Sequence, residues 1–196
     1  QQKIPNSLLI PWYQRAKACL RNSLKTGGDL SPILEGLDIL QKKVPENKRQ
    51  MIDKEVSMQA LSQFCEMTLP SFIIDKNYEV VRLNQKIVRI KGLDISTSPE
   101  LVFKIKGSNG EIAYGAVKVH ISKSKPFSYQ SAELSSALLY EYLKDVLDDD
   151  SIVEPSLCIT IDIFGDRIVP APLNVNEYNR KVEKLCEEIV QLWDAA

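Results

Sequence analysis

The stretch that decides the expected fold is LVFKIKGSNGEIAYGAVKVHI, residues 101–121. Branched and aromatic residues dominate both of its ends, and such residues are enriched in strands. Asn109-Gly110, between the two ends, is typical of a tight hairpin turn. Residues 101–121 are therefore predicted to form an antiparallel hairpin.

Further strands are expected on both sides of this hairpin. Residues 78–83 and 87–90 are short and rich in branched residues, which predicts two strands before it. Leu157–Phe164 is the most continuously apolar segment, so it is predicted as a buried central strand. Gly165-Asp166 favours a turn into a last strand at residues 167–169.

Apolar residues at helical spacing predict three helices before residue 70, one after the hairpin and one at the end of the chain. In the second helix, Ser31 is expected as the N-cap and Pro32 as the first helical residue. The helices are expected at residues 12–25, from residue 31 through at least residue 40, and at 48–66, 128–147 and 176–193.

These elements predict an α/β chain, α+β in detail, that forms a single domain over residues 1–196. Residues 1–70 make up a helical part, residues 76–169 a mixed-sheet core, and residues 175–194 a C-terminal helix. The sequence has no internal repeat, low-complexity segment or evident linker, so one unit is expected.

The net charge is −1, but the charges are unevenly distributed. Residues 76–125 hold 10 Lys/Arg against 4 Asp/Glu, whereas residues 126–196 hold 5 against 14. The basic middle is expected to attract phosphate and the acidic end to repel it. A plain solvated surface is the alternative interpretation of both segments.

No membrane partner and no targeting signal are expected. The longest uncharged apolar stretch, residues 67–74, is interrupted by Pro70 and is far shorter than the roughly 18 residues that a spanning helix needs. Residues 1–12 lack a basic start followed by an apolar run.

Cysteine and histidine usage restricts the possible chemistry. Cys19, Cys65, Cys158 and Cys186 are scattered, so they are interpreted as reduced thiols of a cytoplasmic protein. His120 is the only histidine, and no Cys-x-x-Cys pair exists. Unless His120 serves, a zinc site and a Ser-His-Asp or Cys-His centre therefore lack parts, and a catalytic metal would need oxygen ligands. Glycines at phosphate-loop spacing are also absent, so no nucleotide cofactor is expected.

Two segments carry a resemblance to a known family. They are GLDISTSPELVF, residues 92–103, and GAVKV, residues 115–119. With the order helix, three strands, helix, strand over residues 48–169, they resemble the PD-(D/E)xK, or restriction-endonuclease-like, superfamily. In that family, an acid near the second strand and an acid-x-Lys on the third bind one or two magnesium ions, and the lysine positions the attacking water.

The resemblance implies a set of site residues. Asp94 or Glu100 would be the first ligand of Mg²⁺ or Mn²⁺, and Lys118 the lysine. Ala116 stands where the acid-x-Lys motif has its acid, so one ligand is absent, and some relatives move this acid onto the following helix, where Glu133 lies. Carboxylates are hard oxygen ligands suited to magnesium, which lowers the pKa of bound water and neutralises phosphate charge.

Asp94, Lys118 and Glu133 also have plainer interpretations. Asp94 suits a turn. Lys118 suits the solvated face of a strand, alternating with valines. Glu133 suits the first turn of a helix because of the helix dipole. Asp162 is different, since a carboxylate between Ile161 and Ile163 has to be paired, face a site or lie at a sheet edge.

Two functional hypotheses follow. The first is a Mg-dependent phosphodiesterase, or a nuclease-derived protein that binds DNA or RNA. A basic strand and loop would contact the nucleic-acid backbone through Lys118, His120, Lys123 and Lys125, although no aromatic residues interleave with them. The second is a non-catalytic protein–protein interaction module, with the apolar face of the helix around Trp193 as a partner or homodimer interface.

Overall fold

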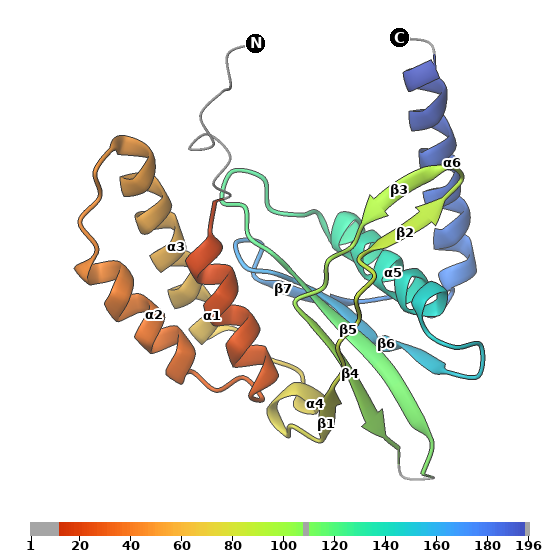
Figure 1. Cartoon of the computed structure of the whole chain (residues 1–196), viewed down its shortest axis with the longest axis horizontal. Coiled ribbons are helices and arrows are strands. Elements are labelled where there is room, and N and C mark those ends of the chain that lie inside the picture. The colour runs from red at the N-terminus through yellow and green to blue at the C-terminus, as the bar shows by residue number, and fades with distance from the viewer. Residues whose placement is uncertain (1–11, 108–109, 195–196) are drawn as a thin grey trace.

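The computed structural model describes residues 12–107 and 110–194, so Asn109 of the predicted turn lies outside the described residues. The chain is α+β (Figure 1). Its helices are α1 Gln14–Lys25, α2 Ser31–Lys42, α3 Lys48–Glu66, α4 Ser71–Ile74, α5 Tyr129–Val146 and α6 Val175–Asp194. Its strands are β1 Tyr78–Val80, β2 Ile87–Ile90, β3 Leu93–Ser96, β4 Leu101–Lys106, β5 Ile112–His120, β6 Ile152–Asp162 and β7 Arg167–Pro170.

The main sheet has the strand order β1-β4-β5-β6-β7. β1, β4 and β5 pair antiparallel, and the predicted 101–121 hairpin is confirmed as the β4–β5 pair. α5 then crosses over the sheet, so β6 runs parallel to β5, and β7 returns antiparallel to β6. Between α3 and α5 the chain also forms α4, β2 and β3, which the predicted order of helix, three strands, helix and strand does not contain.

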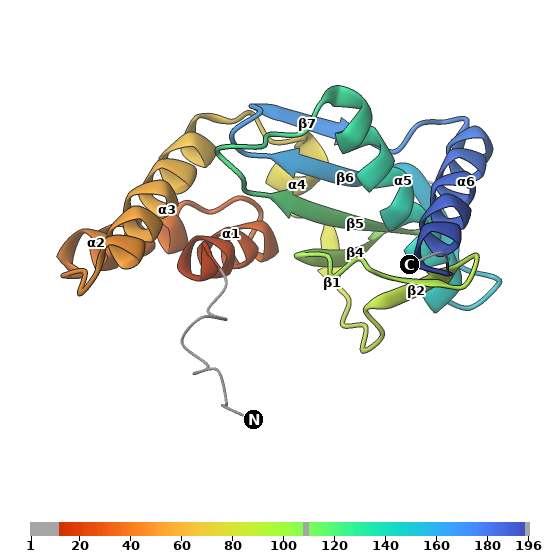
Figure 2. The ribbon, with the colours of Figure 1, turned by 90° about the horizontal axis from the view of Figure 1, so that it is seen from above.

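Helices cover both faces of this sheet (Figures 1 and 2). On one face, Phe103, Val117 and Ile161 pack in a core shared with the N-terminal helices. On the other face, Val102 and Ala116 pack against α5. Because successive strand residues point to opposite faces, each strand contributes to both cores.

The segment between β1 and β4 differs from the prediction. β1 ends at Val80 instead of residue 83, and the predicted strand 87–90 pairs with β3 in a separate two-stranded sheet. The β2–β3 hairpin, residues 87–96, lies over the α5 face of the main sheet and beside α6 (Figure 1). Val88 is its buried anchor, packed in the same cluster as Val102. Because this hairpin buries one apolar residue, its hydrophobic pattern is too short to indicate from the sequence that it is separate from the main sheet.

The predicted buried strand at residues 157–164 is confirmed as part of β6, which pairs with β5 and β7 and is buried over residues 158–162, but its bounds differ. β6 begins at Ile152, five residues before the predicted start, and the middle strand of the sheet is β5. Pro155 lies inside β6, where the register with β5 shifts between Tyr114 and Ala116. A Cβ on Gly115 would lie 2.6 Å from the carbonyl oxygen of Leu157, so only glycine fits beside this irregularity.

The helices follow their predicted ranges with two differences. Ser31 is the first helical residue of α2 and Leu30 precedes it as the N-cap, because the Asp29 carboxylate accepts hydrogen bonds from the Ser31 amide and hydroxyl. The four-residue α4 was not predicted from the sequence. Across the described ranges, no helix combines the length and the apolarity needed to span a membrane.

Candidate functional site

Glu100 and Lys118 are brought together by the register of β4 and β5. Leu101 pairs with Val117, and the Glu100 amide donates to the Val117 carbonyl at 2.9 Å, so Glu100 comes opposite Lys118. The Glu100 side chain is buried, with 5% of its surface exposed. Its Oε2 accepts a hydrogen bond from the Val119 amide at 2.7 Å. The structure thus joins two of the residues predicted from the sequence.

Lys118 connects β5 to the segment that enters β4. Its Nζ donates hydrogen bonds to the carbonyl oxygens of Thr97 and Ser98, each at 2.8 Å. Burial lowers the pKa of Lys118, the Glu100 charge opposes this effect, and Lys17 and Arg21 add to it. The half-buried lysine is therefore part of a positive environment, and not the solvated strand residue of the plainer interpretation.

A cleft of about 750 Å³ opens beside these two residues. Its lining comes from α1, from β1 and the segment that joins β1 to β2, from residues 98–102 at the start of β4, and from α5. The charged lining residues are Arg21, Lys25, Arg82, Lys86 and Glu100. Four cations and one carboxyl group make this cleft strongly positive.

The cations of the cleft are not neutralised by neighbouring acids. None of the ion pairs found among residues 12–107 and 110–194 involves Arg21, Lys25, Arg82 or Lys86. Arg21, Arg82 and Lys86 are also exposed to solvent. Unpaired guanidinium and ammonium groups around one cleft are suited to bind phosphate or another anion.

The two other predicted metal ligands lie elsewhere. Asp94 is an exposed residue of β3, and its Oδ1 is 3.6 Å from Nε of Arg89. Glu133, on α5, accepts a hydrogen bond from the Tyr178 hydroxyl of α6. Neither residue lines the cleft. Asp94 lies on the separate β2–β3 sheet, apart from the cleft, and the Glu133 side chain contacts α6.

A magnesium or manganese centre is therefore a poor fit. Within the described ranges, no three His, Cys, Asp or Glu side chains come together in a group that could hold a metal ion. Ala116, at the acid position of the motif, is completely buried between Val102 and Cys158 on the α5 face of the sheet. Glu100 remains as the one carboxyl group in the lining of the cleft.

The predicted nucleic-acid contacts after β5 form a separate basic segment. The ring of His120 stacks on Phe127 with 3.6 Å between centroids, and its Nε2 lies 2.9 Å from the Lys125 carbonyl. Lys123 donates to Oε1 of Gln59 on α3 at 2.7 Å. None of these three predicted residues lines the cleft, and their contact with nucleic acid stays a prediction.

Asp162 satisfies the expectation that a carboxylate in an apolar strand must be paired. It is completely buried, and its Oδ2 accepts a hydrogen bond from the Phe127 amide at 2.7 Å. Its Oδ1 has no hydrogen-bond partner among the described residues. Asp162 thus fastens the basic segment before α5 to β6.

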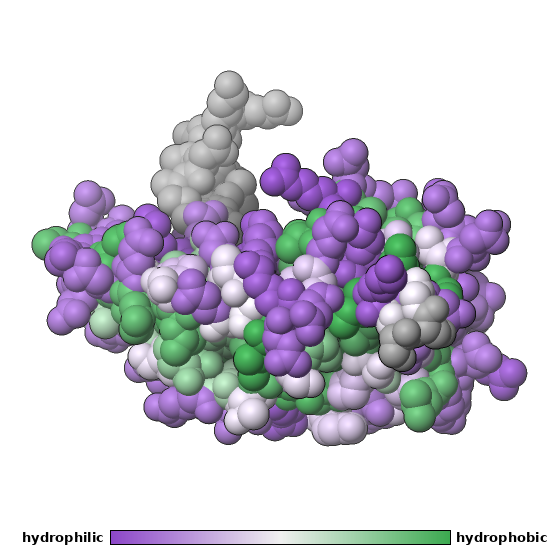
Figure 3. Space-filling view, turned by 90° about the horizontal axis from the view of Figure 1, so that it is seen from below, coloured by the Kyte–Doolittle hydropathy of each residue, from purple (hydrophilic) through white to green (hydrophobic). Residues whose placement is uncertain are grey.

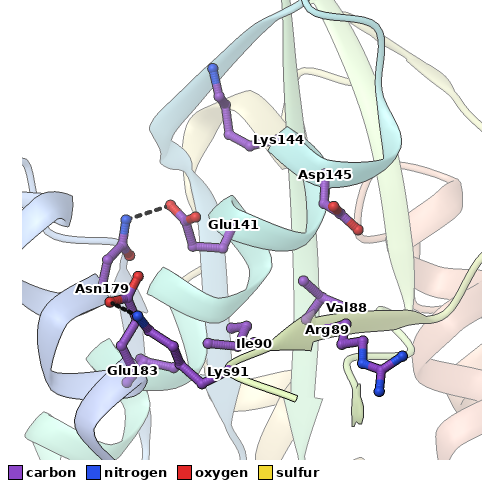
Figure 4. A pocket seen from close by; sticks show the side chains of 10 residues that line it. Val88, Arg89, Ile90, Lys91, Glu141, Lys144, Asp145, Asn179 and Glu183 are labelled. Atoms are coloured by element: carbon purple, nitrogen blue, oxygen red, sulfur yellow. Dashed lines mark hydrogen bonds and ion pairs between the residues drawn. The ribbon is translucent and has the colours of Figure 1, made fainter. Parts of the chain in front are cut away.

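A second cavity lies between the β2–β3 hairpin, α5 and α6 (Figure 4). It measures about 340 Å³ and has charges of both signs in its lining. Lys91 forms ion pairs with Glu183 at 3.2 Å and Glu187 at 3.5 Å. Asn179 donates to Oε1 of Glu141 at 2.7 Å. The polar side chains around this cavity are therefore largely paired with one another.

The four cations of the cleft were missed in the sequence. Lys17, Arg21 and Lys25 recur at four-residue spacing, which places a basic stripe along one side of α1 and is a readable signal. Arg82 and Lys86 lie in a segment without regular structure, so no periodicity marks them. Only the fold brings this segment beside α1.

Comparison with known proteins adds no identification. No family model matches the sequence, and neither a curated protein nor a solved structure matches the chain. The assignment of function therefore depends on the chemistry of the cleft.

Proposed function

We propose that this protein binds nucleic acid in the cleft beside Lys118, as a nuclease-derived binding protein on a PD-(D/E)xK-like scaffold. The observation that carries the proposal is the set of unpaired cations, Arg21, Lys25, Arg82 and Lys86, in one cleft. Phosphate contacts supply much of the affinity of nucleic-acid-binding proteins, and arginine and lysine are the residues that make them.

The arrangement of the cations suits a strand that carries several phosphates. They come from two segments, α1 and the connection from β1 to β2, and apolar side chains of β1 and β4 lie between them. A ligand with spaced negative charges can contact both segments at once. Lys118 is linked to the cleft through Ser98, a lining residue whose carbonyl group accepts a hydrogen bond from the Lys118 ammonium group.

Binding without cleavage is the activity that this cleft supports. The described residues bring one carboxyl group, Glu100, to the cleft, and Ala116 provides no second ligand beside Lys118. A metal-dependent phosphodiesterase normally holds its ion with more than one carboxylate. In this proposal, Lys118 holds residues 97–98 in place through hydrogen bonds to their carbonyl groups.

Fluorescence anisotropy with labelled single-stranded RNA and DNA tests the proposal. The variant Arg82→Ala/Lys86→Ala is expected to weaken binding by at least tenfold, since two phosphate contacts are lost. The control is Lys42→Ala/Lys184→Ala, which removes the same amount of charge from α2 and α6. Equal losses in the two variants, or no binding by the native chain, would refute the cleft as the binding site.

Addition of magnesium, manganese or chelator to the same mixtures tests the enzyme hypothesis. We expect intact oligonucleotides in every mixture. Metal-dependent cleavage that Glu100→Ala abolishes would instead establish a nuclease and overturn the binding-only function.

Homodimerisation through α6 is a second candidate function. Leu185, Ile189 and Leu192 follow the three-and-four spacing of a coiled-coil seam and are exposed, as is Trp193 at 68%. The last turns of α6 rise past the hairpin in Figure 1. On the face shown in Figure 3, by contrast, hydrophobic residues form separate patches between hydrophilic ones.

A second copy of the chain offers the same seam to this helix, so it is the partner that the spacing favours. Sedimentation of the native chain and of Leu192→Glu tests this candidate. A concentration-dependent dimer that the variant abolishes supports it, and a native monomer at all concentrations refutes it.

A further inference from the structure

Glu100 is an unusual group to find in a cleft of cations. It is buried to 95%, given that 5% of its surface is exposed, and it lies among residues that attract anions. A carboxylate at such a position would repel a phosphate group that came close to it. The position of Glu100 therefore calls for a partner other than phosphate.

One carboxylate oxygen of Glu100 is free to face a ligand. Oε2 is taken by the Val119 amide, and no other side-chain hydrogen bond or ion pair of Glu100 occurs among the described residues. Four side-chain polar atoms of the described residues are fully buried without a hydrogen-bond partner: Ser23 Oγ, Ser57 Oγ, Asp162 Oδ1 and Asn179 Oδ1. Oε1 of Glu100 is not among them. Glu100 is part of the cleft lining, so a ligand bound there comes beside its carboxyl group, of which Oε1 is the oxygen without a partner.

Lys118 does not satisfy this oxygen. Its ammonium group donates to the Thr97 and Ser98 carbonyls, and no ion pair joins it to Glu100 within the described ranges. A mostly buried carboxylate with one hydrogen bond gains free energy when a ligand supplies a second donor. The four cations repel a cationic donor, so the donor expected beside Glu100 is a neutral O–H or N–H group of an anionic ligand.

The lining of the cleft favours a donor on the backbone of the ligand over a donor on a base. Recognition of splayed bases relies on aromatic rings that stack with them. The one aromatic residue in the lining is Tyr142, which is 1% exposed and uses its hydroxyl to donate to the Gln85 carbonyl at 2.5 Å. Among the described residues, the cleft lining therefore has no exposed ring on which a base could stack.

We infer that the cleft selects RNA over DNA, with Oε1 of Glu100 accepting a hydrogen bond from a ribose 2′-hydroxyl. Within a strand, the 2′-hydroxyl is the one hydrogen-bond donor of the sugar-phosphate backbone, and DNA lacks it. A cleft of about 750 Å³ has the size of a small-molecule site, so it fits a short single-stranded segment better than a duplex. This inference rests on the proposed function and names its substrate class.

Three short oligomers of the same base test the inference in the full-length chain. Oligouridine, oligodeoxyuridine and 2′-fluoro-oligouridine differ at the 2′ position, and the fluorinated strand keeps an RNA-like sugar without the donor. We expect oligouridine to bind about tenfold more tightly than either of the others, as one hydrogen bond to a charged group predicts.

The variant Glu100→Gln tests whether Glu100 causes the preference for oligouridine. Glutamine keeps an acceptor for the Val119 amide and removes the charge, so the preference for oligouridine is expected to disappear while oligodeoxyuridine binds equally or more tightly. Glu141→Gln, the same substitution at the second cavity, is the matched control and is expected to keep the preference. Thermal melting checks that both variants are folded.

The outcomes separate the two proposals. Equal binding of the three oligomers, tighter binding of oligodeoxyuridine, or an unchanged preference in a folded Glu100→Gln protein would overturn RNA selection and leave the binding function standing. A native chain that binds none of them would overturn the binding function itself. If Glu100→Gln does not fold, the comparison of the three oligomers on the native chain still decides.

Discussion

Two cavities border the connection from β1 through the β2–β3 hairpin, and they treat charge in opposite ways. In the cavity of Figure 4, Lys91 is paired with two glutamates of α6. In the cleft beside Lys118, the described lining residues combine the cations of α1 and of residues 82–86 with one carboxyl group, that of Glu100. The difference shows that the number of basic residues does not identify a binding site, because neighbouring acids decide whether their charge is available.

The largest expected effect is on binding and contrasts the two cavities directly. Arg82→Glu/Lys86→Glu in the cleft is expected to weaken RNA binding on the order of a thousandfold, because two charge-assisted contacts become repulsions. Arg89→Glu/Lys144→Glu in the lining of the second cavity is the matched reversal. It is expected to change affinity little, as titrations by anisotropy at one salt concentration would show. Similar losses from both reversals would erase the distinction between the cavities.

A second prediction concerns the acid position of the nuclease motif. Ala116→Asp places a carboxylate at a completely buried site on the α5 face, which is expected to lower the free energy of unfolding by about 3 kcal/mol. Urea denaturation measures the loss. Addition of magnesium is expected to leave it unchanged, since Asp94 and Glu133 have other partners. Recovery of stability with magnesium would reveal a latent metal site.

A third prediction follows from the pKa of Lys118, which burial lowers. At pH values below the lowered pKa, the folded protein carries a desolvated ammonium that opposes folding, and this penalty is relieved as the pH rises through the folded pKa toward the ordinary value of about 10.4. Lys118→Met removes the titrating group. The stability of the native chain relative to this variant is therefore expected to rise between neutral and alkaline pH, measured by urea denaturation at both. A difference that stays constant or falls would contradict the lowered pKa.

The smallest expected effect concerns the ion pairs of the second cavity. Lys91→Ala breaks the pairs with Glu183 and Glu187, but all three side chains are at least 42% exposed, so solvent screens their interaction. We expect a loss of about 0.5 kcal/mol that shrinks with added salt. Thermal melting at low and high salt measures it, and a loss of several kcal/mol would mean that the hairpin depends on these pairs.

Much of the fold followed from the sequence because it depends on local patterns. The long helices, the β4–β5 hairpin and the order of the core elements were predicted from apolar spacing and turn residues. The two-stranded β2–β3 sheet and the early start of β6 were not. These two differences from the prediction depend on the burial of single side chains such as Val88 and on an irregular strand register at Gly115.

The candidate site divides in the same way. The sequence by itself determined that Glu100 directly precedes the hairpin that contains Lys118 and that a basic segment precedes an acidic one, since strand pairing and composition are properties of neighbouring residues. Only the tertiary structure decided that Asp94 and Glu133 lie apart from Lys118, with partners of their own, and that Arg21 and Lys25 of α1 meet residues 82–86 in one cleft. The packing of α1 and of the β1–β2 connection around the sheet places these charges, and no local pattern in the sequence encodes contacts over such separations.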